Sequence, residues 1–597
     1  MDAISKGASR PGAQTEASPT GQPAIGAAGF NLDFATINEE EEFLLKTEAY
    51  ADGEMSDDAY RGYRLTRGVY GQRIDGIFML RIKAPGGMLT PAQARTVAEI
   101  IAASPSRAGH ITTRENFQIH DMVPAEIADF KEKLNAAGLT QVDACGNTVR
   151  NVVQDPFAGL HPDEAFDPTP YLQGLVRFFL GNPRSQDMPR KFKIAFSGST
   201  ADRGYAAIND IGLIAVRSED DKPAFKVLCG GGLASLPRSA ITLHDAWPAN
   251  DILTPVCAAI DLFQDHGNRR LRSKARIKHV LRTLGDEAFV ALYRTYLERV
   301  QADPPTALGV EPRLHEASEG WRYIPPTDAE AQASGLTAWA RTSVSETRLH
   351  GKVFVTIRLD DGGELTPESL GILADAAEGF GEGVMQLTHQ QNIVLRAVNA
   401  EDIPALFDLL AASNLARPGP LSIADVTSCP GTDTCNLGIT SSRQLARRLS
   451  VRLGTRDDTD LTMKISGCHN SCGQHHIGTI GLHGAVKRIG GRVAPHYQLL
   501  VGGHIGGGVA TFGETIGFVP SGRVEAVVDR LLEHADREKA DGETAGDFLR
   551  RVTPTSLVPV VADLLEIEAA DSREEDFVDV GNDTAFVVLR RKGECAA

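Results

Sequence analysis

The sequence predicts an α+β protein made of two fused, diverged copies of one unit. A segment that begins at residue 78, FMLRIKAPGGMLTPAQA, matches a second that begins at residue 354, FVTIRLDDGGELTPESL. The Gly-Gly pair at 86–87 returns at 362–363, and Asn116 returns as Asn392. The Leu-Thr-Pro triplet returns at the same spacing, so a single ungapped repeat explains all of these matches. Internal repeats of this kind indicate that the architecture itself is duplicated.

Each small repeat has the same predicted order of elements: a strand, a Gly-rich turn, a helix, a second strand and a second helix. The first helix begins near Pro91 in one copy and near Pro367 in the other, and AEIADFKEKLNAAG at 125–138 is an example of the second helix. This order is compatible with one half of a ferredoxin-like fold. The segments that follow the two small repeats also match each other, with a second constant offset between matching residues. For example, Ser197-Gly198 matches Ser466-Gly467.

Composition and charge exclude several classes of protein. With 42% hydrophobic and 23% charged residues the chain is of the globular type, and it has no apolar run long enough to predict a membrane span. The first residues are rich in Ala, Gly, Ser and Pro without an apolar core, which predicts a disordered tail at 1–35 rather than a secretory signal. An organelle transit peptide is the alternative, although Arg10 is its only arginine. The net charge of −17 argues against a general nucleic-acid binder.

Four of the eight cysteines form two tight pairs. Cys429 and Cys435 have five residues between them, and Cys468 and Cys472 have three. Thiolates this close, in loops rich in Pro and Gly, suit an iron–sulfur or soft-metal site. Buried thiols, disulfides and a zinc site are the alternatives, but zinc sites usually use shorter spacings. Paired cysteines and an oxygen-sensitive site fit a reducing cytosol, which predicts a cytoplasmic protein.

The C-x5-C and C-x3-C spacings, with GCHNSCG around the second pair, resemble the signature of the sirohaem-dependent sulfite and nitrite reductases. The resemblance implies that Cys429, Cys435, Cys468 and Cys472 bind a [4Fe–4S] cluster and that Cys472 also binds the sirohaem iron. His469 stands where many relatives carry a small residue or proline, and we expect ligation to be unaffected.

The resemblance also implies a pseudo-two-fold α+β fold with three lobes. The paired ferredoxin-like halves would span 36–142 and 345–420. The two lobes that cradle the cofactors would span 143–344 and 421–570. The final segment, 571–597, is predicted to be a strand-rich tail without an assignment.

The implied reaction adds six electrons to a small oxyanion and consumes protons, so it needs fixed positive charge and proton donors. In this family the matching residues come from the first copy, and they are Arg81, Arg150, Lys191 and Lys193. Alternation along a strand places both lysines on one face. Relatives that reduce nitrite often carry Asn at the position of Lys193, so the sequence favours reduction of sulfite to sulfide. Reduction of nitrite to ammonia is the alternative.

Other residues are assigned to the cofactor or to a partner. TTRENFQIH at 112–120 resembles the sirohaem-contacting strand of the family, which makes Arg114 and Gln118 the candidate macrocycle contacts. The basic segment 269–278 would meet the carboxylates of sirohaem. A second basic stretch, 443–456, is either a docking site for an acidic ferredoxin or a solvated helix face. Cys145 lies near the haem edge or is a buried thiol without a function.

The electrons must come from another protein. There is no G-x-G-x-x-G motif followed by an acidic residue and no recognisable flavin segment, so a ferredoxin or a flavoprotein subunit is expected as donor. Two further functions remain open, a precorrin-modifying oxygenase and a non-catalytic iron–sulfur electron carrier. VGGHIGGG at 501–508 lacks the ending of a phosphate loop and predicts a closely packed backbone instead.

Overall fold

The computed structural model describes residues 30–35, 39–311, 314–315, 321–454, 456, 458–589 and 594. Most of the predicted amino-terminal tail, residues 1–29, lies outside the described residues. The end of that tail is described, and there Leu32 and Phe34 are buried. The Phe34 N–H donates to the Gly138 carbonyl at 2.8 Å. The packed part of the chain therefore includes residues before 36.

The two small repeats fold into two five-stranded antiparallel sheets that share one hydrophobic core. The first sheet has the order β1 (Val69–Gly71), β2 (Phe78–Ile82), β5 (Phe117–Met122), β4 (Gly109–Ile111) and β13 (Glu364–Leu365). The second has the order β11 (Val344–Glu346), β12 (Lys352–Ile357), β15 (Ile393–Asn399), β14 (Met385–Leu387) and β3 (Met88–Leu89). This is the paired arrangement that the repeat predicts.

Each half donates one short strand to the sheet of the other half. β13 pairs with β4, and β3 pairs with β14, so the exchange is reciprocal. The exchanged strand directly follows the Gly-Gly turn in both copies. The Gln386 Nε2 donates to the Gly86 carbonyl at 2.6 Å, which ties the turn of one half to the sheet of the other.

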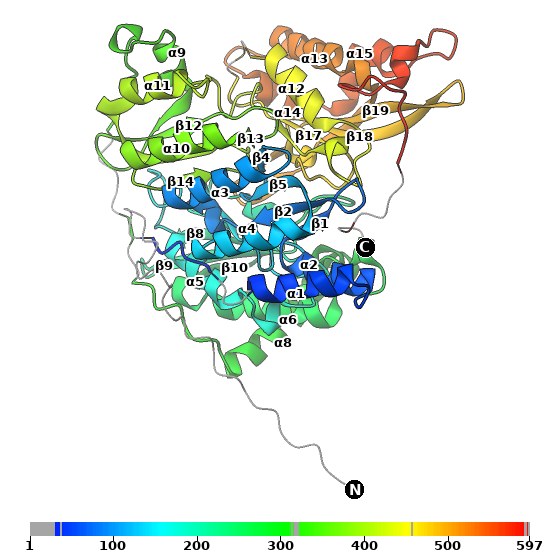
Figure 1. Cartoon of the computed structure of the whole chain (residues 1–597). Coiled ribbons are helices and arrows are strands. Elements are labelled where there is room, and N and C mark those ends of the chain that lie inside the picture. The colour runs from blue at the N-terminus through cyan, green and yellow to red at the C-terminus, as the bar shows by residue number, and fades with distance from the viewer. Residues whose placement is uncertain are drawn as a thin grey trace.

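Helices pack on these sheets. Thr90 caps α3 by accepting from the Gln93 N–H at 3.1 Å, and Pro91 occupies the first helical position, as the sequence predicts. Figure 1 shows α3 beside α10, its counterpart in the second copy. The helices of this lobe are α1 (Glu39–Ala51), α2 (Asp57–Thr66), α3 (Pro91–Ala103), α4 (Pro124–Ala136), α9 (Leu336–Ser343), α10 (Pro367–Gly379) and α11 (Ile403–Ala411).

The two larger segments form sheets of matching design, with two parallel pairings followed by two antiparallel ones. The first is β6 (Val153–Gln154), β7 (Ile194–Ser197), β8 (Ile211–Arg217), β9 (Pro223–Cys229) and β10 (Ile241–Pro248). The second is β16 (Thr427–Ser428), β17 (Met463–Ser466), β18 (Ile480–Ile489), β19 (Arg492–Val501) and β22 (Glu514–Pro520). The constant spacing between the later matching segments therefore reflects a second duplicated unit.

Each of these sheets has its own helices and core. In Figure 1 the first lobe runs from cyan to green and the second from yellow to red, on opposite sides of the paired halves. The helices of the first are α5 (Thr169–Phe179), α6 (Leu253–His266), α7 (Ile277–Leu284) and α8 (Asp286–Ala302). Those of the second are α12 (Ser442–Arg452), α13 (Val524–Glu538), α14 (Ala545–Arg551) and α15 (Val558–Leu565).

The Gly-rich segment at 501–508 leads into a two-stranded hairpin of β20 (His504–Gly506) and β21 (Val509–Thr511). A Cβ atom on Gly503 would lie 2.6 Å from the His476 carbonyl. The backbone is closely packed here, as predicted.

The end of the chain also packs against the protein. Phe577 and Val580 are buried, within the segment predicted as an unassigned tail. Further on, the Glu594 carboxylate pairs with Arg64 and accepts from the Gly71 N–H at 2.6 Å. Residues 590–593 and 595–597 lie outside the described residues.

In the part of the chain that the structure describes, no helix combines the length and the apolarity that crossing a membrane requires.

The exchanged strands generate a stability prediction. Gly87 and its counterpart Gly363 have φ of 73° and 78°, and a Cβ atom would lie 2.6 Å from the Leu387 carbonyl or 2.8 Å from the Gln391 carbonyl. We expect Gly87→Ala and Gly363→Ala each to lower the free energy of unfolding by about 1 to 3 kcal/mol or more, because alanine disfavours this backbone and the carbonyls cannot withdraw.

Urea unfolding followed by circular dichroism measures this effect. Gly371→Ala in α10 is the matched control, because nothing lies within 4 Å of the place that its Cβ atom would take and alanine favours helix. A Gly87→Ala midpoint equal to that of the control would show that the strand exchange tolerates a side chain.

Candidate functional site

The four cysteines of the two pairs come together at one edge of the second large sheet. Cys429 follows β16 and Cys468 follows β17, and these strands are parallel neighbours, so their carboxyl ends meet. None of the four forms a disulfide in the structure. Burial and the neighbouring thiols of Cys472, Cys429 and Cys435 all raise the pKa of Cys468, so the four sulfurs share one local environment.

Close backbone packing shapes the loops that carry these thiols. A Cβ atom on Gly467 would lie 2.6 Å from the Gly431 Cα, so only glycine fits at this contact. The Gly467 N–H donates to the Cys429 Sγ at 3.2 Å, and the Ser442 Oγ lies 3.5 Å from the same sulfur. Donors aimed at a sulfur stabilise its thiolate form and are typical of iron–sulfur ligands.

The donor set fits an iron–sulfur cluster. Four cysteine thiols share one local environment, in loops that close backbone contacts shape. Cysteine thiolates are the usual ligands of a [4Fe–4S] cluster.

The first copy contacts the loop of the last cysteine. The Thr113 Oγ1 donates to the Cys472 carbonyl at 2.7 Å, and the Gln474 Nε2 donates back to the Thr113 carbonyl at 3.3 Å. Arg114 is the next residue, and its guanidinium donates to the Asn209 Oδ1 at 2.7 Å. The thiol loops of the second copy and the cations of the first thus meet at one centre.

The predicted cations lie together in this region. Arg81 and Arg150 both donate to the Ala144 carbonyl, at 3.3 and 2.8 Å. Lys193 lies close enough to Arg114 and Lys191 for both to affect its ionisation. The structure therefore brings Arg81, Arg150, Lys191 and Lys193 into one group, together with Arg114.

Arg276 and Asp210 complete this group and were not predicted individually. The Arg276 Nε and Nη2 donate to the two Asp210 oxygens at 2.8 and 2.7 Å, and the pair is almost fully buried. The Lys193 backbone N–H also donates to Asp210, at 2.8 Å. Arg276 belongs to the predicted basic segment 269–278, whereas nothing in the sequence around Asp210 indicates its partners.

The electrostatics of the group are those of an anion site. Burial lowers the pKa of Lys193 well below its ordinary value, and the positive charges of Arg114 and Arg276 add to the effect. Burial is also the main reason that the pKa of Arg114 falls to about 10. The buried Arg114 Nε has no hydrogen-bond partner among the described residues. The positive charges of this group repel one another, so a bound anion would stabilise them, and the Arg114 Nε can donate to it. A macrocycle with several carboxylates would be such an anion.

The other basic residues of the segment 269–278 differ in their roles. Arg270, Arg272 and Lys274 are exposed, and the buried Lys278 Nζ donates to the Leu233 and Ser235 carbonyls at 2.7 and 2.9 Å. Lys278 therefore closes a turn, while the exposed residues are available to carboxylates.

The second basic stretch, 443–456, forms α12 and the turn after it, and its arginines are paired with acidic side chains. Arg447 lies 3.2 Å from Asp361, and the Arg452 Nε donates to Asp529 at 2.7 Å. Arg448 pairs with Glu525 at 2.5 Å, and Arg443 with Glu364 at 2.7 Å. These acids offset the positive charge, so the structure favours the interpretation of a solvated helix face over a docking site.

Gln118 and Cys145 both lie beside Arg81. The Cys145 Sγ is 3.4 Å from the Arg81 Nη1, and Cys145 is fully buried. Gln118 lies between Arg81 and His110, a histidine that the sequence did not single out. Besides the family resemblance, the sequence marks this neighbourhood by a difference between the copies, because Arg81 and Gln118 are polar where the second copy has Ile357 and Val394.

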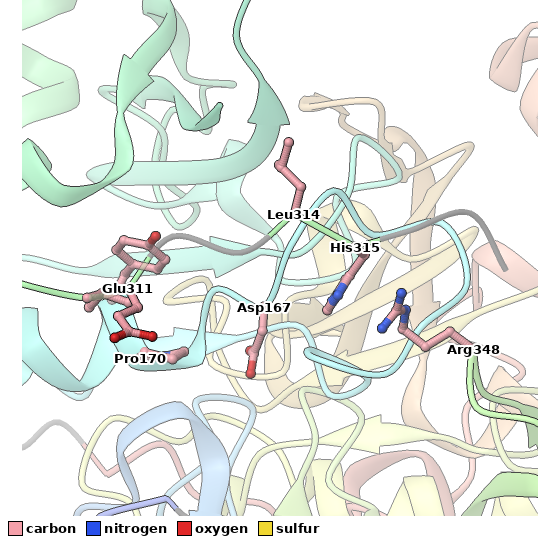
Figure 2. A pocket seen from close by; sticks show the side chains of 8 residues that line it. Asp167, Pro170, Glu311, Leu314, His315 and Arg348 are labelled. Carbon is pink, nitrogen blue, oxygen red and sulfur yellow. The ribbon is translucent and has the colours of Figure 1, made fainter. Parts of the chain in front are cut away.

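A cavity of about 490 Å³ lies apart from this group. Its walls include Asp167, Tyr171, His315 and Arg348, and Figure 2 shows that charged side chains of both signs surround it. None of the predicted site residues lines it, and we assign it no role.

Comparison with known protein families supports an iron–sulfur protein with an internal duplication. The family model of the nitrite/sulfite reductase ferredoxin-like half domain matches residues 70–137 and again 347–413, which confirms the duplication. The family model of the nitrite and sulphite reductase 4Fe-4S domain matches residues 145–300, in the first copy.

Whole proteins of two activities are similar to this chain. A sulfite reductase [ferredoxin] of Mycobacterium tuberculosis is 29% identical, over 80% of this chain and 83% of the relative. A ferredoxin–nitrite reductase of Synechococcus elongatus is 30% identical, over 76% of this chain and 85% of the relative. The solved structure of the Mycobacterium tuberculosis NirA protein has a TM-score of 0.72 and 26% identity, and covers 87% of this chain and 97% of that one. The chain therefore belongs to the nitrite and sulfite reductase family, whose cofactors are a [4Fe–4S] cluster and sirohaem.

Proposed function

We propose that this protein reduces sulfite to sulfide with six electrons, in assimilation. The observation that carries the proposal is the hydrogen bond between Thr113 and Cys472, which joins the group of cations to the four cysteines. Relatives named for sulfite and for nitrite reduction are almost equally similar, so reduction of nitrite to ammonia is the second candidate.

In this proposal Cys429, Cys435, Cys468 and Cys472 bind the [4Fe–4S] cluster, and Cys472 is shared with the sirohaem iron. When bound, the cluster would pass on the electrons of the external donor, and the sirohaem would supply the redox-active iron. Arg114 and the basic segment 269–278 would bind the macrocycle carboxylates, because guanidinium groups match carboxylates in charge and geometry.

Arg81 and Arg150 would bind the substrate. Both are permanently charged, and their shared acceptor, the Ala144 carbonyl, holds the two guanidinium groups together. Charges held in place before the anion arrives need no reorganisation during the reaction.

Lys193 would supply protons. Its lowered pKa makes its ammonium group a stronger acid than an ordinary lysine. A bound anion stabilises the protonated form of Lys193. Substrate binding would therefore favour protonation of Lys193, which would then donate this proton to an oxygen atom that leaves the substrate as water. The sequence expectation that both lysines lie on a strand is wrong, because β7 begins only at Ile194. Lys191, two residues before Lys193 in the segment that leads into β7, would assist.

The second lysine favours sulfite over nitrite. Sulfite carries more negative charge near neutral pH, and an additional cation at position 193 offsets that charge. The chain would receive electrons from a ferredoxin, as the names of several relatives indicate for those proteins, with a flavoprotein subunit as the alternative. Its thiolate ligands fit a reducing environment, and we place it in the cytoplasm.

The cluster ligands can be tested by iron content. We expect Cys435→Ser, purified without oxygen, to lose most of its iron, because a hydroxyl is a poor ligand for iron in a sulfide cluster. Cys257→Ser is the control, since Cys257 is a buried thiol of the first large lobe and should leave iron unchanged. Full iron content in the Cys435→Ser protein would remove Cys435 from the ligand set.

Substrate preference can be tested at Lys193. We expect Lys193→Asn to lower kcat/KM for sulfite by about tenfold or more and to shift preference towards nitrite, because one half-buried cation of the group is lost. Steady-state rates with a chemically reduced donor measure both values, and the exposed Lys222→Asn is the control. A wild-type protein that strongly prefers nitrite, with no effect of Lys193→Asn, would replace sulfite by nitrite as the substrate.

The proton-donating role predicts a pH profile. The ammonium form of Lys193 exists below its pKa, which is lowered, so kcat/KM should fall as pH rises through a value below the usual range of lysine. Lys193→Arg keeps the charge but holds its proton, so this alkaline limb should disappear and the maximal rate should decrease. An identical alkaline limb in Lys193→Arg would assign the titration to another group.

A further inference from the structure

Arg81 belongs to a row of polar side chains that crosses the first ferredoxin-like sheet. Arg81 on β2 stands directly opposite Gln118 on β5, and Gln118 stands opposite His110 on β4. His120 lies two residues after Gln118, so it points to the same face of the sheet. His110, Gln118 and His120 are all buried.

The far end of the row has a defined hydrogen-bond direction. The Asp121 backbone N–H, which can only donate, donates to the Gln72 Oε1 at 2.9 Å. The Gln72 Nε2 donates in turn to the Asp121 Oδ1 at 2.8 Å. This orients the Gln72 amide, and the His120 Nδ1, 3.2 Å from the same Oε1, must therefore donate to it.

The hydrogen bonds of the His120 and His110 rings follow the same direction. Burial lowers the pKa of His120 to about 3 and that of His110 well below its ordinary value, so both rings are neutral near pH 7. With its proton on Nδ1, His120 accepts at Nε2 from the His110 Nδ1, 3.1 Å away. His110 then accepts at its own Nε2 from the Gln118 amide nitrogen at 3.3 Å.

The last link reaches Arg81. The Gln118 amide nitrogen faces His110, so its oxygen faces Arg81 and accepts from the Arg81 Nε at 2.9 Å and from Nη2. Every bond from Arg81 to the Asp121 carboxylate therefore points the same way. Hydrogen bonds aligned in one direction polarise and strengthen one another. The Arg81 Nη1 remains directed at the Ala144 carbonyl.

The duplication shows that the fold does not require this row. In the second copy, the positions that correspond to Arg81, His110 and Gln118 hold Ile357, Gln386 and Val394. The corresponding strands β12, β15 and β14 pair in the same order as β2, β5 and β4. Because the second copy folds in the same way without this row of polar side chains, the row has a role specific to the first copy. Arg81 stands at its end.

We propose that Gln118, His110, His120, Gln72 and Asp121 form a positioning chain that holds the Arg81 guanidinium in the orientation that binds the anionic substrate. The identity of the anion and its binding by Arg81 rest on the proposed function. The chain orients and does not conduct protons, because the Gln118 amide keeps both of its protons near neutral pH. Gln118 thus acts on Arg81 rather than as the macrocycle contact that the family resemblance implies.

Two variants break the chain and one preserves it. His110→Leu removes the donor and acceptor in the middle, and Gln118→Val copies the residue of the second copy. His110→Gln also copies the second copy, but it keeps one donor and one acceptor. All are made in the full chain with its cofactors.

We expect His110→Leu and Gln118→Val to raise KM for the preferred anion about tenfold, with kcat changed less than about threefold, because a charged donor loses its fixed acceptor. Sirohaem absorbance and iron per chain should stay at wild-type values. His110→Gln should keep KM within about threefold of wild type. In an Arg81→Ala background, Gln118→Val should have no further effect on KM, because the chain acts only through Arg81.

Three results would overturn the proposal. The first is an unchanged KM in both His110→Leu and Gln118→Val, and the second is a rise in KM caused by Gln118→Val that is as large in the Arg81→Ala background as in the wild type. The third is loss of sirohaem absorbance in Gln118→Val, which would make Gln118 a macrocycle contact. If the wild-type protein reduces neither anion, the proposed function fails, but the positioning chain is still tested. A crystal structure of Gln118→Val should then show the Arg81 guanidinium displaced, and an undisplaced guanidinium would reject the chain.

Discussion

The reciprocal exchange of two short strands is the interaction on which the site depends. Because β3 pairs with β14 and β13 with β4, the loop at 112–116 of the first half cannot move independently of the second half. That loop carries Thr113 and Arg114, which contact the Cys472 loop and the cation group. The registers of two very short strand pairs therefore determine how cations and thiols face one another.

The two copies have divided the chemistry between them. The first copy holds the group of cations and the polar row of Arg81, while the second holds the four cysteines and has apolar residues where the first has Arg81 and Gln118. Neither copy alone contains both the group of cations and the four cysteines. The two sets meet where the copies contact each other, at the hydrogen bond between Thr113 and Cys472.

The sequence predicts the features that are local. Strand, Gly-Gly turn and Pro-initiated helix are encoded within a few residues, and the cysteine spacings identify their loops directly. The partnership of Arg276 with Asp210 joins residues far apart in the chain, and no local pattern marks it. The acids that pair with α12 are equally distant, so in the sequence a basic stretch resembles a docking surface. The role of Gln118 depends on which way one amide faces, and only the hydrogen bonds around it decide that.

The contacts of Glu594 have a practical consequence for work with this enzyme. Glu594 binds Arg64 and Gly71, and the Gly71 carbonyl accepts from Asn436, the residue after Cys435. Two hydrogen bonds thus connect Glu594 with a residue next to Cys435. A change that displaces the Glu594 carboxylate would act on the loop of Cys435, so protein intended for spectroscopy should keep Glu594 unmodified.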